Sequence, residues 1–131
     1  MLDIKKMLKN ILKQMTVTEP TASITATTGS LLRVETIKCG RIVTMRLTVY
    51  NNQTVNSGAN LFAGKLQTTS LLPSVAATGC GFFGARSINA NMETDGSIVV
   101  RNASAVTMAT SSSDTVGITL TYISKSGGGT A

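Results

Sequence analysis

The sequence has no histidine, no tryptophan, only two cysteines and only six acidic residues among its 131. Without histidine it lacks the commonest general base, the usual partner of a nucleophilic serine or cysteine, and a frequent zinc ligand. Cys39 and Cys80 stand in no C-x-x-C spacing, and we expect them to be reduced thiols in apolar surroundings. These absences predict a protein that is not an enzyme and that holds no metal and no cofactor.

Aromatic residues and long apolar runs are also scarce. The net charge of +6 suggests nucleic acid as a partner, but two Tyr and three Phe supply too few rings for bases to stack upon. No apolar run approaches the roughly 18 residues that span a bilayer, and lysines interrupt the N-terminal segment where a secretory signal would lie. We therefore expect synthesis in the cytoplasm, no nucleic-acid binding and no membrane insertion.

Small polar residues dominate what is present, since Thr, Ser, Gly and Asn make up 53 of the 131 residues. Threonine with valine and isoleucine favours extended chain, whereas glycine, asparagine and serine favour turns. From residue 42 to 50 and again from 115 to 122, apolar and polar residues alternate, which is typical of strands with one buried face. Further strands are expected at residues 23–27, 31–39, 61–67, 79–85, 87–91, 97–101 and 105–110.

Turn signals separate these segments, among them Thr28-Gly29-Ser30, Cys39-Gly40 and Asp95-Gly96. Eight or nine short strands at this spacing predict an all-β chain, folded as an antiparallel β-sandwich or jelly roll. The glycine-rich stretch 79–84 is no phosphate-binding loop, because its flanks are predicted strands and no helix follows it. Small residues there are expected to let a sheet bend or approach another chain closely.

Residues 1–16 differ in character, because this segment has no glycine or proline and only one threonine, at its end. Apolar residues recur at helical spacing, and four of them are spaced four, three and four apart, as in the seam of a coiled coil. That seam consists of Ile4, Leu8, Ile11 and Met15. A helix of about 15 residues is marginal by itself in water, so its apolar stripe requires a cover.

The stripe has three candidate covers: the chain's own β domain, other copies of the same helix, or a membrane surface. Residues 17–22 form an extended linker in which Pro20 disfavours a helical conformation for Glu19, so self-association is favoured. The expected organisation is a coiled-coil helix (1–16), a linker (17–22), a β-sandwich head (23–125) and a flexible tail (126–131).

A family resemblance rests on residues 60–104. Asn60-Leu-Phe-Ala-Gly-Lys-Leu66 is followed by Leu72-Pro73-Ser74, a glycine-rich strand and Asp95-Gly-Ser-Ile-Val-Val-Arg-Asn102. This order resembles the C-terminal head domains of bacteriophage tail-fibre and baseplate receptor-binding proteins. The family pattern often has Gly-Tyr-Arg-Pro after the Leu-Pro turn, where this chain has Ser74-Val-Ala-Ala77.

The resemblance implies a homotrimer in the tail or baseplate of a virion, attached to other tail proteins and binding saccharides on the host cell surface. Saccharide recognition requires polar side chains and a ring, and the candidate contacts are Tyr50, Asn51, Asn52, Arg86, Asn89 and Asn91. Two alternatives remain open at this stage. The same trimer could be a structural decoration without a receptor, or residues 1–15 could form a basic helix that binds a membrane surface.

Overall fold

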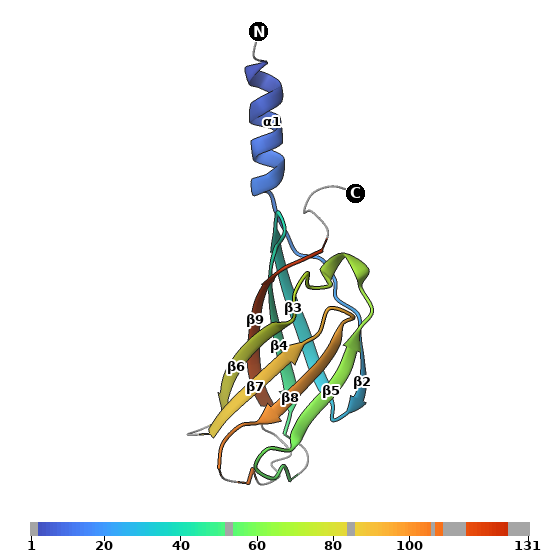
Figure 1. The fold of residues 1–131 in the computed structure, drawn as a ribbon, viewed down its shortest axis with the longest axis vertical. Helices are drawn as coiled ribbons and strands as arrows, with labels where there is room; N and C mark the ends of the chain where they lie inside the picture. Colours follow the sequence, from blue (N-terminus) through green and yellow to red (C-terminus); the bar gives the residue numbers. More distant parts are fainter. Residues whose placement is uncertain (1–2, 52–53, 84–85, 106, 109–114, 126–131) are drawn as a thin grey trace.

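The computed structural model describes residues 3–51, 54–83, 86–105, 107–108 and 115–125, and it confirms a mostly antiparallel β chain behind one short helix (Figure 1). The N-terminal half contains α1 (Ile4–Met15), β1 (Val17–Thr18), β2 (Ile24–Thr28), β3 (Leu31–Cys39) and β4 (Ile42–Tyr50). The rest contains β5 (Asn60–Leu66), the 3-10 helix η1 (Thr69–Leu71), β6 (Ala77–Phe83), β7 (Arg86–Met92), β8 (Ser97–Asn102) and β9 (Thr115–Ile123).

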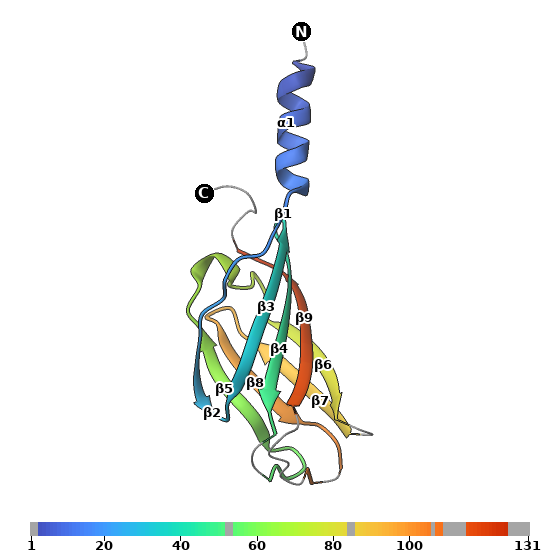
Figure 2. The same ribbon diagram turned by 180° about the vertical axis from the view of Figure 1, so that it is seen from behind.

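Hydrogen bonds connect the nine strands into one curled antiparallel sheet in the order β1-β3-β4-β9-β6-β7-β8-β5-β2. The sheet consists of two halves that face one another, with β3, β4 and β9 behind β5, β6, β7 and β8 in Figure 1 and in front of them in Figure 2. The two-sheet division of a sandwich or jelly roll is not confirmed, because the halves remain joined between β9 and β6.

That junction is narrow and built from glycine. β9 pairs with β4 at nine positions, but it pairs with β6 only at Gly79↔Leu120 and Cys80↔Thr119. A Cβ atom on Gly79 would overlap the carbonyl oxygen of Thr119, and one on Gly81 would overlap that of Gly117. The small residues in this stretch therefore allow a close backbone approach, but to strand β9 of the same chain, and the expected approach to another chain stays a prediction.

The alternating pattern places one face of each strand inside the curl. The fully buried side chains on β4 and β9 belong to the apolar set of the alternation, and β5, β7 and β8 supply the facing half of the core. This core includes Val43, Met45, Leu47, Val49, Leu61, Phe62, Leu66, Ile88, Ala90, Met92, Ile98, Val100, Val116, Ile118 and Leu120. Burial of this apolar area is the main force that holds the two halves together.

Two predicted turns take the conformation that only glycine adopts without strain. Gly40, between β3 and β4, has φ 61°, and Gly96, between β7 and β8, has φ 94°. In the second turn the Ser97 amide donates to Asp95 Oδ1 at 2.9 Å, and this hydrogen bond lowers the pKa of the Asp95 carboxyl below its usual value. The Asp-Gly hairpin expected from the sequence is confirmed.

The end of the sheet opposite the helix carries the β4–β5 and β8–β9 connections. Asn102, which is fully buried, ties them together: its Nδ2 donates to the Val55 carbonyl at 3.1 Å, and its Oδ1 accepts from the Ser104 hydroxyl at 2.6 Å. Val55 also forms an isolated bridge with Met108. We call this region the far end.

Most predicted strands agree with the observed ones within two residues, and 31–39 and 42–50 agree fully. The strand expected at 105–110 is not observed in its described part, where Met108 forms only the bridge with Val55. The expected linker is extended, but Val17 and Thr18 pair with Cys39 and Lys38 and so belong to the sheet. The expected tail, 126–131, lies outside the described residues.

Candidate functional site

The helix α1 projects away from the sheet, beyond the end at which β3, β4 and β9 converge (Figures 1 and 2). Asp3 begins it, because its Oδ1 accepts from the Lys6 amide at 3.1 Å and its carbonyl accepts from the Met7 amide at 3.0 Å. A side-chain acceptor of this kind satisfies amides that have no partner inside the first turn. The helix is thus started by its own sequence rather than by contacts with the sheet.

The apolar stripe of α1 is exposed in the single chain. Ile4 is 61% exposed, Leu8 51% and Ile11 43%, whereas the side chain of Met15 lies outside the described residues. For the three described seam residues, packing against the chain's own β domain is therefore excluded. Lys5, Lys6 and Lys9 are also exposed.

A second apolar feature lies on the outer face of the sheet at the helix end. The pairings Val17↔Cys39, Cys39↔Ile42 and Ile42↔Ile123 place four residues side by side across β1, β3, β4 and β9. Val17, Ile42 and Ile123 are 61%, 55% and 54% exposed, and Cys39 is half-buried. We call these four residues the apolar row; it begins two residues after α1 ends.

Below the apolar row the same face becomes polar and flat. The hydroxyls of Thr44 and Thr121 lie 3.3 Å apart, and Arg46 Nη1 donates to Thr119 Oγ1 at 3.4 Å. Cys80 is exposed on β6, which corrects the expectation that it lies in apolar surroundings.

The structure describes only some of the predicted saccharide contacts, and these lie at the end of β4 and on β7. Tyr50 is half-exposed at the far end, whereas Asn51 beside it is fully buried in the single chain. Asn52 and the side chain of Arg86 lie outside the described residues. Asn89 and Asn91 are exposed on β7, where they line a shallow hollow of about 380 Å³ with Thr78 and Cys80 of β6.

Two buried polar side chains form hydrogen bonds to the backbone of η1, at the end of the core that is nearer to α1. Lys38 Nζ donates to the Ser70 carbonyl at 2.8 Å, and burial lowers the pKa of this ammonium group. Tyr122 Oη donates to the Leu71 carbonyl at 2.6 Å, and burial raises the pKa of its phenol well above the usual value. Both hydrogen bonds hold η1 against the sheet.

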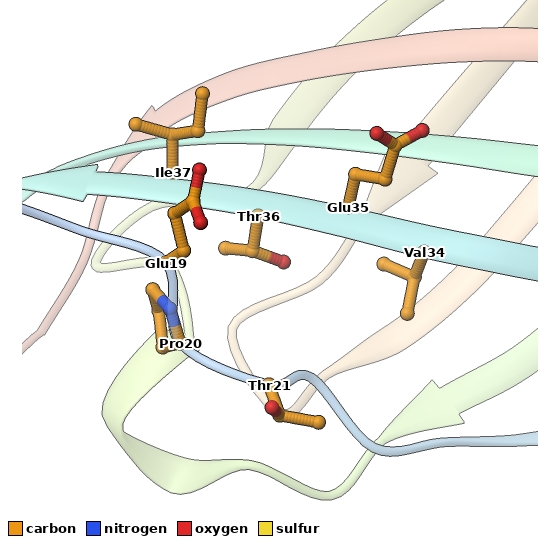
Figure 3. Close-up of a pocket in the computed structure, with 7 residues that line it drawn as sticks. All are labelled: Glu19, Pro20, Thr21, Val34, Glu35, Thr36 and Ile37. Atoms are coloured by element: carbon orange, nitrogen blue, oxygen red, sulfur yellow. The ribbon is translucent and has the colours of Figure 1, made fainter.

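Sequence reasoning missed one further feature, a groove of about 300 Å³ between residues 34–37 of β3 and residues 19–21 (Figure 3). We call it the β3 groove. Its signal in the sequence was weak but present: Thr36 and Lys38 are polar, yet they lie on the face of β3 that points into the curl, opposite Met45 and Val43 of β4.

Among the described residues, no three or more cysteine, aspartate or glutamate side chains gather where they could hold a metal ion. Likewise, no helix in that part of the chain is long and apolar enough to cross a membrane. No known protein-family model and no curated protein matches the sequence.

Proposed function

We propose that this chain is a homotrimeric, non-enzymatic attachment head, of the kind carried by bacteriophage tail fibres and baseplates, that binds saccharides on a bacterial surface. Three copies of α1 form a short coiled coil, and the β domains are held side by side beyond it. The observation that carries the proposal is that α1 stands clear of its own sheet with Ile4, Leu8 and Ile11 exposed.

The identities of the seam residues favour more than two strands. Their spacing puts Leu8 at an a position and Ile4 and Ile11 at d positions of a heptad. This arrangement favours trimers or tetramers over dimers in parallel coiled coils. Full burial of each such side chain contributes about 1.5–3 kcal/mol relative to full exposure, so three half-exposed residues gain only part of this. A coiled coil of only two heptads therefore binds the three chains together weakly.

The apolar row supplies a second contact. Because it follows α1 directly, copies joined through α1 have their apolar rows close together. Once one contact has formed, the other becomes intramolecular and benefits from a high effective concentration. The hydroxyls of Thr44 and Thr121 lie below the row on the same face of the sheet.

The test of assembly is the mass of the intact particle at micromolar concentration, measured by light scattering. The wild type is expected at three chains of 13.6 kDa each. Ile11→Glu places a charge in the seam and is expected to give single chains with an unchanged β-sheet circular dichroism spectrum. Asn10→Glu adds the same charge one residue away, off the seam, and should remain trimeric. A monomeric wild type, or a trimeric Ile11→Glu, would contradict this part of the proposal.

The test of attachment is adsorption of the labelled protein to bacterial cells before and after their surface glycans are removed. Adsorption is expected to require the glycans and to fall in Ile11→Glu, because three linked heads bind more tightly than one. A trimer that adsorbs to no bacterial surface would instead be a structural decoration. Binding to anionic liposomes that disappears in Lys5→Gln/Lys9→Gln would assign α1 to a membrane surface.

A further inference from the structure

The β3 groove contains a buried hydroxyl that the fold does not use. Thr36 is only 6% exposed, and its Oγ1 has no hydrogen-bond partner among the described residues. In Figure 3 its side chain points from β3 toward the 19–21 segment, between Glu19 and Val34. A buried polar atom without a partner destabilises the folded protein, and a valine of nearly the same shape would avoid this. The hydroxyl is therefore best explained by a partner that enters the groove.

The backbone of β3 also faces the groove with its hydrogen-bonding groups. In the described part of the chain, β1 covers this edge of β3 only at Lys38 and Cys39. The Lys38 carbonyl points to that edge, since it accepts from the Thr18 hydroxyl at 3.4 Å. Because the direction alternates along an antiparallel strand, Thr36 and Val34 point their N–H and C=O groups to the same edge. The groove thus offers main-chain donors and acceptors beside the unused hydroxyl.

One carboxylate and two apolar groups complete the walls on the Thr36 side of β3. Glu19 is exposed at the rim, and Pro20 and Val34 add carbon surface. Glu35 and Ile37 project from the opposite face of β3 (Figure 3), where Glu35 Oε1 lies 3.3 Å from Arg33 Nε. The Glu19 carboxylate disfavours an anion as the occupant, and a single exposed carboxylate holds a cation only weakly.

We propose that the β3 groove binds a single neutral pyranose ring. Sugar hydroxyls both donate and accept hydrogen bonds, so they match the Glu19 carboxylate, the Thr36 hydroxyl and the strand edge, while the C–H face of the ring packs on Pro20 and Val34. A volume of about 300 Å³ is at the small end for ligand sites, and it suits one ring better than a peptide strand. The inference rests on the proposed attachment function, for which it provides the saccharide contact.

The experiment is an amide chemical-shift titration of the full-length, isotope-labelled protein with methyl glucoside, methyl galactoside, methyl mannoside and N-acetylglucosamine. At least one of them is expected to shift the amides of residues 19–21 and 34–37 saturably. Methyl glucuronide, which adds only a carboxylate to methyl glucoside, is the matched probe and is expected to cause no saturable shift. Calcium chloride tests a cation at the same place.

Thr36→Val separates a ligand contact from a merely structural residue. The variant is expected to denature at a higher urea concentration than the wild type and to bind the sugar about tenfold more weakly, since the change removes an unpaired group from the fold and a partner from the ligand. Thr44→Val, on β4, removes a hydroxyl outside the groove and should leave the affinity unchanged.

Three results would overturn the inference: no neutral sugar shifts the groove amides, calcium shifts them and sugars do not, or Thr36→Val binds as tightly as the wild type. Glycan-dependent adsorption of a trimer to cells, without any sugar-induced shift of the groove amides, would support the attachment function and place its saccharide contact outside the groove. Sugar binding in the groove of a protein that is monomeric, or that does not adsorb to cells, would support the inference about the groove and contradict the attachment function.

Discussion

Gly81 of β6 and Gly117 of β9 lie beside the narrow β6–β9 ladder, and they make a matched pair for testing what joins the two halves of the sheet. In Gly81→Ala the new methyl group would overlap the Gly117 carbonyl oxygen, which is backbone and cannot move without moving β9. In Gly117→Ala the methyl group would meet only the guanidinium of Arg46, the exposed end of a flexible side chain. The two substitutions are chemically identical and differ only in what they meet.

The expected magnitudes follow from this difference. Overpacking against a fixed backbone costs about 1–3 kcal/mol, and replacing glycine by alanine recovers roughly 0.4–1 kcal/mol through the unfolded chain. Because β6 and β9 pair at only two positions, displacement of Gly81 also weakens the ladder hydrogen bonds beside it. Gly81→Ala should therefore lower the free energy of unfolding by about 2 kcal/mol. Gly117→Ala should stay within about 0.5 kcal/mol of the wild type.

The measurement is urea denaturation, followed by circular dichroism at one fixed protein concentration, since self-association adds to the apparent stability. A loss of about 2 kcal/mol corresponds to a fall in Tm of several degrees for a chain of this size. Equal effects of the two substitutions, or a Gly81→Ala protein as stable as the wild type, would refute the idea that a tight backbone approach at β6 closes the sheet.

Two further predictions concern the side chains that fasten η1. Tyr122→Phe removes a buried 2.6 Å hydrogen bond and should lower the free energy of unfolding by about 1–2 kcal/mol in urea titrations; an unchanged midpoint would mean that the bond contributes nothing. Lys38→Met removes an ammonium group whose pKa is lowered from 10.5 by burial in the folded protein. At a pH between the lowered pKa of the folded state and 10.5, the unfolded wild type therefore binds more protons than the folded wild type. The wild type should thus gain stability relative to Lys38→Met as the pH rises toward 10.5, and a difference that is constant with pH would contradict the role of burial.

Local patterns in the sequence determined the faces of the strands but not their neighbours. Alternation identified the buried side chains of β4 and β9, and glycine next to threonine, cysteine or aspartate marked turns correctly at Gly29, Gly40 and Gly96. The pairing of β2 with β5, which joins Ile24 to Leu66, and that of β4 with β9, which joins Ile42 to Ile123, depend on segments far apart in the chain. Nothing in a local period specifies such a partner, so the curled sheet could not be derived.

For the candidate sites, too, local sequence patterns predicted some features, whereas others depend on contacts between distant segments. The exposed seam of α1 follows from its own period and needed no knowledge of the sheet. Asn51 was chosen as a candidate contact for its polar side chain, which is fully buried in the structure. The β3 groove needed the three-dimensional structure, since residues 19–21 lie beside residues 34–37 only because β1 pairs with the end of β3, and no local pattern specifies that pairing.

If the chain is an attachment head, as proposed, the route of the chain out of α1 has a mechanical consequence when the protein is pulled through that helix. Tension that enters at the helix passes first to β1 and then to β2, and both strands run away from the helix, antiparallel to their partners β3 and β5. A pull along that axis drags each strand lengthwise past its neighbour, so its hydrogen bonds resist together instead of opening one after another. A pull through α1 thus places the pairings of β1 with β3 and of β2 with β5 in shear.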